Sequence, residues 1–190
     1  ILADETGIQV TNSTFAGGVT NAGTILGGDR GVNIDVGTFS DLGITNSGWI
    51  DAATGTGVAV DAVTFNGGIR NSGTITGTTA GIYLNGTTFN GGINNSGTVS
   101  VSDSSSDGEA ILVDTTNFND GLTNSGLLSG QTGVEVNSSS VKGGFTNSGH
   151  VDAGSYGVYY SINDWANGNF TNSGTIQAED FDNGGSSVAY

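Results

Sequence analysis

Two acidic stretches hold the residues best suited to ligand chemistry. Their carboxylates are Asp103, Asp107 and Glu109 in the first stretch and Glu179, Asp180 and Asp182 in the second. Calcium prefers carboxylate oxygens of this kind, so the two stretches are candidate calcium sites. Neither stretch matches the calcium-loop spacing D-x-[DN]-x-[DN]-G. The alternative, which we favour, is a pair of solvated acidic loops without any cofactor.

A second set of polar residues recurs once in each repeat of the chain. Its members are Thr11, Asp35, Asp61, Asn85, Asp114, Asn137 and Ser161. If the repeats stack, Asp35 and Asp61 lie about one strand spacing apart, ~4.8 Å, which is close enough to share a cation. Asp and Asn are also the residues that turns prefer, and we favour this interpretation of the set.

The residues that polysaccharide-cleaving enzymes need are scarce in this chain. Glycoside hydrolysis requires two positioned carboxylates in a cleft, and lyase chemistry requires a base beside cationic groups or calcium. The basic side chains are Arg30, Arg70 and Lys142, and they fall at three different positions of the repeat. His150 is the sole histidine, and its position in the repeat is predicted to point outward. We therefore expect no catalytic residues and a protein that is not an enzyme.

Composition and charge narrow the classes of partner. The 190 residues include 35 Gly, no Pro and no Cys, and the formal net charge is -15 at pH 7. Such an acidic chain lacks the long-range attraction to phosphate that nucleic-acid binding requires. Without Cys, the chain has no disulfide, thiol nucleophile or zinc-thiolate site. No run of about 18 apolar residues occurs, so we expect no membrane insertion by this segment.

One repeated motif organises the whole chain, and residues 89–99, with the sequence FNGGINNSGTV, represent it. The central asparagines of the copies are Asn21, Asn46, Asn71, Asn95, Asn124, Asn147 and Asn172. Their spacings are 25, 25, 24, 29, 23 and 25 residues, a period typical of solenoids. Ile1 and Tyr190 both fall inside a repeat, so we expect residues 1–190 to be one β-solenoid segment of a longer repeat protein.

Apolar residues recur at five positions of the repeat. In the first copy these positions are Ile8, Val10, Phe15, Val19 and Ile25. Alternation in short segments broken by Gly, Ser and Asn predicts strands and turns rather than helices. Stacked copies turn each position into a buried column, so we expect an all-β, right-handed parallel β-helix. It should have three strands per turn and about seven turns of about 25 residues.

The Asn-Ser-Gly corner of the repeat makes two predictions. An inward Asn in a stack can donate its amide to one neighbouring turn and accept from the other, so the seven asparagines should form a ladder. A Gly follows each Asn two residues later, as Gly97 follows Asn95. We expect this Gly to have the positive φ that a sharp corner requires.

The repeat is lengthened at one corner in two places. Eleven residues separate Val99 from Ile111 and Ile176 from Val188, where five to seven are usual. These insertions are the two acidic stretches. Because lengthened corners project from a solenoid without breaking its core, we expect binding at these corners or on the outward columns.

The motif resembles the passenger domains of autotransporters and related secreted adhesins. The resemblance lies in the recurring F-x-G-G-I-x-N-S-G-x-I and the G-V-x-V that follows it. It implies a right-handed β-helix at the outer-membrane cell surface or in the extracellular space, with an adhesive or scaffolding role and a surface glycan or protein receptor as partner. One alternative is head-to-tail self-association into an extracellular filament. A polysaccharide-active enzyme is a less favoured alternative.

Overall fold

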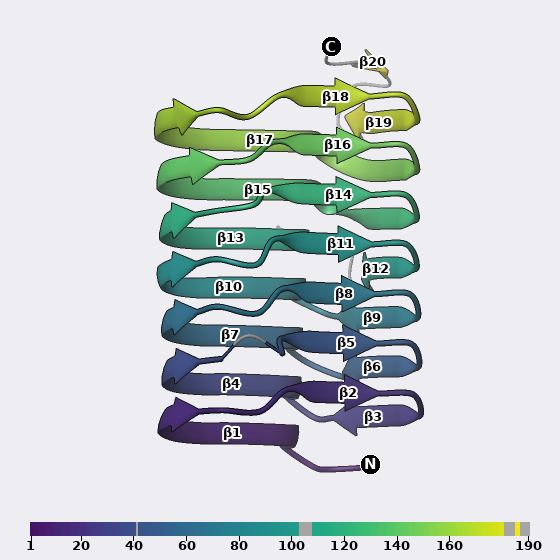
Figure 1. Cartoon of the computed structure of the whole chain (residues 1–190). Helices are drawn as coiled ribbons and strands as arrows, with labels where there is room; N and C mark the ends of the chain where they lie inside the picture. The colour runs from purple at the N-terminus through teal and green to yellow at the C-terminus, as the bar shows by residue number, and fades with distance from the viewer. Residues whose placement is uncertain (41, 103–107, 181–184, 187–190) are drawn as a thin grey trace.

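A computed structural model describes residues 1–40, 42–102, 108–180 and 185–186. Within these residues the chain is all-β, and its parallel strands stack as a β-solenoid of about seven turns (Figure 1). The predicted all-β parallel solenoid of about seven turns is therefore confirmed. In the described part of the chain there is no helix long and apolar enough to span a membrane.

Three kinds of strand recur along the chain. The ten-residue strands are β1 (Thr6–Phe15), β4 (Arg30–Phe39), β7 (Thr56–Phe65), β10 (Ala80–Phe89) and β13 (Glu109–Phe118). The three-residue strands are β2 (Val19–Asn21), β5 (Ile44–Asn46), β8 (Ile69–Asn71), β11 (Ile93–Asn95), β14 (Leu122–Asn124), β16 (Phe145–Asn147) and β18 (Phe170–Asn172). The four-residue strands are β3 (Thr24–Gly27), β6 (Trp49–Ala52), β9 (Thr74–Gly77) and β12 (Thr98–Val101).

The strands near the C-terminal end differ from this scheme. In β15 (Leu127–Lys142) and β17 (His150–Ala166) a short strand runs on into a long one. The short and long strands thereby share one 13-stranded sheet, and the three-residue strands form a 7-stranded sheet. The last two strands are β19 (Thr175–Asp180) and β20 (Gly185–Ser186), which pair antiparallel, whereas the other strand pairs of the described residues are parallel.

All five predicted apolar columns are present. Ile82, for example, pairs with Val58 on one side and with Ile111 on the other. Most members of the columns are fully buried, and the end turns are more open, as Phe170 is 49% exposed. Each turn can bury its apolar side chains only against its neighbours, which explains how a chain with so few hydrophobic residues forms a core.

The third column is a stack of phenylalanine rings. Between Phe15 and Phe118, successive ring centroids lie 4.7 to 5.7 Å apart. In the next turn Val141 pairs with Phe118, while Phe145 pairs with Leu122 in the fourth column. The large and small side chains have thus exchanged columns, which keeps the volume of the core nearly constant.

The asparagine ladder is confirmed along its whole length. In each of six links, the side-chain Nδ2 of one Asn donates to the Oδ1 of the next at 2.7 to 2.8 Å. Nδ2 also donates to two backbone carbonyls, which for Asn95 are those of Gly97 and Leu127. A second, shorter ladder joins Asn119 to Asn90 and Asn90 to Asn66. Both ladders satisfy amides that the stack would otherwise leave without partners.

The predicted positive φ at the Asn-Ser-Gly corner is wrong. Among these corner glycines none has a positive φ, and most of the glycines that do have one shortly precede a three-residue strand, such as Gly92 at 65°. The corner requires Gly for a different reason, which is close approach. A Cβ on Gly97 would lie 2.0 Å from the carbonyl oxygen of Gly73 in the neighbouring turn. No side chain fits between turns at that distance.

Candidate functional site

The structure places only some of the predicted calcium ligands. Asp103, Asp107 and Asp182 lie outside the described residues, and Asp180 is described only by its backbone, which pairs with Gly185. Glu109 begins β13, and Glu179 in β19 accepts a hydrogen bond from Gln177 at 2.5 Å. Over the described ranges, no group of three or more His, Asp or Glu side chains is arranged to hold a metal. Calcium binding stays a prediction.

The second predicted set of polar residues does form a continuous column. Asp35 pairs with Asp61, and the column lines a polar hollow of about 390 Å³ farther along, at Asn85, Asp114 and Asn137. Together with burial, the carboxylates of this column raise the pKa of the nearby Tyr83 phenol. Burial raises the pKa of Tyr83, Asp114 and then Asp61 raise it further, and Arg30 lowers it. The column therefore places three exposed carboxylates, Asp35, Asp61 and Asp114, on the outer face of the long strands.

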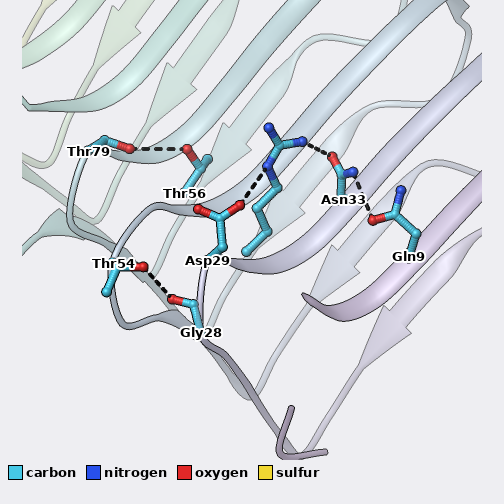
Figure 2. A network of polar contacts seen from close by, with 8 residues as sticks. Gln9, Gly28, Asp29, Asn33, Thr54, Thr56 and Thr79 are labelled. Carbon is cyan, nitrogen blue, oxygen red and sulfur yellow. Dashed lines mark hydrogen bonds and ion pairs between the residues drawn. The ribbon is translucent and has the colours of Figure 1, made fainter. Parts of the chain in front are cut away.

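The basic residues are far from forming one cluster. Arg30 belongs to a polar network near the N-terminal end of the solenoid, and its partners Asp29 and Asn33 are labelled in Figure 2. It donates to Asn33 Oδ1 at 2.6 Å, and its Nε lies 3.6 Å from Asp29 Oδ2. Asn33 in turn donates to Gln9 at 2.9 Å. Arg70 lies in β8 of the other sheet, and Lys142 lies at the end of β15, both exposed.

The corner before the long strands varies in length, and this variation produces a recess. Ser100 and Glu109 pair with Ser129 and Thr132 in the next turn. Eight residues lie between Ser100 and Glu109. Only Gly130 and Gln131 lie between Ser129 and Thr132. In the following turn, three residues lie between Asp152 and Tyr156, which pair with Ser129 and Thr132. The extra residue appears as a register shift after Gly130. The corner at Gln131 is thus the shortest of this region.

Two hollows flank Gln131. The first, which we call the tyrosine recess, has a volume of about 300 Å³. It is lined by Glu109, Gln131, Thr132, Glu135, Ser155, Tyr156 and Tyr159. The second, which we call the histidine recess, has a volume of about 290 Å³ and includes His150, Asp152, Gln177 and Glu179. Residues from four turns line these two hollows, so carboxylate, amide, imidazole and phenol groups from different repeats lie close together at this corner.

The tyrosine recess presents two aromatic rings beside carboxylates. The centroids of Tyr156 and Tyr159 lie 5.7 Å apart with an angle of 47° between the rings, and the residues are 59% and 43% exposed. Gln131 donates its amide to Ser155 Oγ at 2.5 Å. Glu135 accepts from Asn137 Nδ2 at 2.7 Å. These bonds fix polar groups at the recess while the aromatic faces stay open to solvent.

The sequence motifs did not point to this recess. Glu109 was predicted as a calcium ligand and His150 as an outward residue, but no prediction brought them together with Gln131 or Tyr156. The available signal was the 23-residue spacing between Asn124 and Asn147, the shortest in the chain, directly after the 29-residue spacing. A shortened corner beside a lengthened one leaves a hollow between neighbouring turns.

Comparisons with known proteins add no assignment. No family model matches the chain, and searches of curated proteins and of solved structures find no match either.

Proposed function

We propose that this chain is a non-catalytic structural and adhesive rod of an extracellular, autotransporter-like surface protein. The observation that carries the proposal is that the interior of the solenoid repeats from turn to turn while one corner varies in length. The Asn ladder and the five buried columns continue through all turns, whereas the corner before the long strands changes length from turn to turn. Such a rod can display different surfaces without a change to its core.

The chemistry of the surface fits binding better than catalysis. Arg30 is engaged with Asp29 and Asn33, and the other two basic residues lie on different elements. The tyrosine recess, by contrast, combines open aromatic faces with carboxylate and amide groups, which is the composition of a recognition surface. We therefore place the adhesive contact at the Gln131 corner.

The test is retention of chain-coated beads on cultured cells and on arrays of matrix proteins and glycans. We expect retention on at least one surface under flow. The matched control is a set of beads coated with an unrelated acidic protein at the same charge density, because the net charge of -15 alone can cause weak adhesion. Equal retention of both bead types, or none on any surface, would contradict the proposal. Release of cleaved sugar from a polysaccharide panel would instead support an enzyme.

A self-assembling filament is the second candidate. Within the described residues, strands β1 and β2 each pair with one neighbour only, namely β4 and β5, whereas Leu2 also bridges Leu26 on the outer edge of β3. An open strand edge can pair with another chain. Electron microscopy of the concentrated chain separates the two proposals. Regular filaments would favour the filament proposal, and a monodisperse monomer would eliminate the filament proposal.

A further inference from the structure

We propose that the tyrosine recess binds a cationic side chain, Arg or Lys, of a basic peptide segment on a partner protein. The inference names the class of partner for the proposed adhesive contact and therefore rests on that function. It is carried by the geometry of two tyrosine rings, by the carboxylates beside them and by the charge of the chain.

The two rings offer faces for a cation. Tyr156 and Tyr159 come from one strand, β17, and their tilted rings lie 5.7 Å apart. A cation within about 6 Å of a ring centroid is attracted by the negative face of the ring, and guanidinium groups also stack on aromatic rings. Because both residues are substantially exposed, an incoming side chain can reach these faces without rearrangement of the core.

Carboxylates stand beside the rings. Glu135 and Glu109 come from the two preceding long strands and line the same hollow, and neither Lys nor Arg is among its lining residues. Asn137 donates to Glu135 Oε1, which orients the carboxylate. A guanidinium or ammonium group in the recess would thus meet an anion and an aromatic face together.

The charge of the whole chain favours a basic partner. The net charge of -15 attracts basic segments over long range and raises their association rate. A neutral sugar can also stack on tyrosine, but it would bring no charge to complement that of the Glu135 carboxylate. Charge complementarity therefore selects a basic peptide over a glycan.

The experiment is a calorimetric and NMR titration of the full 190-residue chain with a capped Gly-Arg-Arg-Gly peptide at low and physiological salt. We expect saturable binding with one site, and a loss of affinity of about two- to fivefold in Tyr159→Ala and in Glu135→Gln. Two matched controls isolate the recess from general charge and aromaticity. Trp49→Ala removes an aromatic residue of equal exposure, 44% against 43% for Tyr159. Asp35→Asn makes the same charge change as Glu135→Gln at a remote site.

The outcomes separate this inference from the proposed function. Equal weakening in the recess variants and the two controls would show non-specific attraction and overturn the inference, as would no saturable binding. A glycan whose binding depends on Tyr159 while the peptide binds without it would overturn the inference in favour of sugar. Unchanged melting temperatures of the variants confirm that they fold. If Tyr159→Ala does not fold, the milder substitution Glu135→Gln still tests the recess. If the peptide fails but coated beads still adhere, only this inference fails; peptide binding without bead retention rejects the adhesive function instead.

Discussion

Asn95 donates a 2.8 Å hydrogen bond to Asn124 across 29 residues of chain, and Asn71 donates one of the same length to Asn95 across 24. The two repeats therefore differ by five residues without any effect on the ladder. The insertion falls wholly at the corner between β12 and β13, because the pairing on both sides keeps its register. This independence allows the corners of the solenoid to differ while the interior stays constant.

The ladder should make a measurable contribution to stability. Asn95 is fully buried, and Asn95→Ala would remove the ladder bonds to Asn71 Nδ2 and Asn124 Oδ1 and leave these buried groups with fewer partners. We expect the free energy of unfolding to fall by about 1–3 kcal/mol, since unsatisfied buried polar groups are costly. Denaturant unfolding measures this change.

The neighbouring residue provides the control for the ladder. Asn94 lies in the same strand, β11, but its side chain is exposed, so Asn94→Ala should change stability by less than about 0.5 kcal/mol. Equal effects of the two substitutions would show that loss of an Asn, and not loss of the ladder, determines the stability.

The corner glycines should tolerate a methyl group only where no turn precedes them. A Cβ on Gly97 would lie 2.0 Å from Gly73 O, whereas a Cβ on Gly23 would meet nothing within 4 Å. We expect Gly97→Ala to lower the free energy of unfolding by about 1–3 kcal/mol or more through displacement of the backbone. Gly23→Ala should cost less than about 0.5 kcal/mol. Melting curves of the two variants test the close-approach explanation. Equally strong destabilisation by both would show that the corner conformation, and not contact with the neighbouring turn, requires Gly.

The core could be predicted from the sequence because the period fixes the register. Once the copies are aligned on Asn95 and its equivalents, Phe89 must lie between Phe65 and Phe118, which is what the pairing shows. The reason for the corner glycine could not be predicted in this way. A sequence shows that Gly is required, but whether the absent Cβ or a positive φ is required depends on a carbonyl 24 residues away.

The recess was missed for a similar reason. A shortened corner has no motif of its own, because its depth depends on the corners of the turns on either side. The residues that line the tyrosine recess come from β13, β15 and β17. Apart from Glu109, a candidate calcium ligand, each of them looks like an ordinary outward residue within its own repeat. Inserted residues, such as those of the acidic stretches, are visible in a sequence, whereas missing residues are not.

The exchange of large and small residues in the core should appear as energetic coupling. Val141 and Phe145 are both fully buried, and they occupy the positions of Phe118 and Leu122 in the preceding turn. Val141→Phe alone should overpack this region at a cost of about 1–3 kcal/mol. The double variant with Phe145→Leu reproduces the preceding pattern, so its cost should be at least about 1 kcal/mol below the sum of the single costs.

A distant pair of substitutions controls the coupling experiment. Ile34 is buried in the same core but lies four turns from Phe145, so Ile34→Val and Phe145→Leu should be additive within about 0.5 kcal/mol. Additivity of the Val141 and Phe145 variants as well would mean that the two columns do not share volume.

Alkaline pH should destabilise the fold through Tyr160. Its hydroxyl is buried and has no hydrogen-bond partner among the described residues, and its ring packs 5.0 Å from that of Trp165. Burial raises the pKa of Tyr160, so the folded chain keeps the phenol proton at pH values where the unfolded chain releases it. The free energy of unfolding should therefore be unaffected by this group below about pH 10 and should fall as the pH rises above it.

Tyr160→Phe tests this dependence directly. The variant removes both the buried hydroxyl and its ionisation, so at neutral pH it should be as stable as the parent chain or more stable. Between about pH 10 and 11.5 its melting temperature should fall less steeply, with the remaining slope coming in part from Tyr83, whose pKa burial and nearby carboxylates also raise. Tyr156→Phe, at a residue that is 59% exposed, is the control and should keep the parent slope. If Tyr160→Phe and the parent chain lose stability equally above pH 10, Tyr160 is not the group that limits alkaline stability.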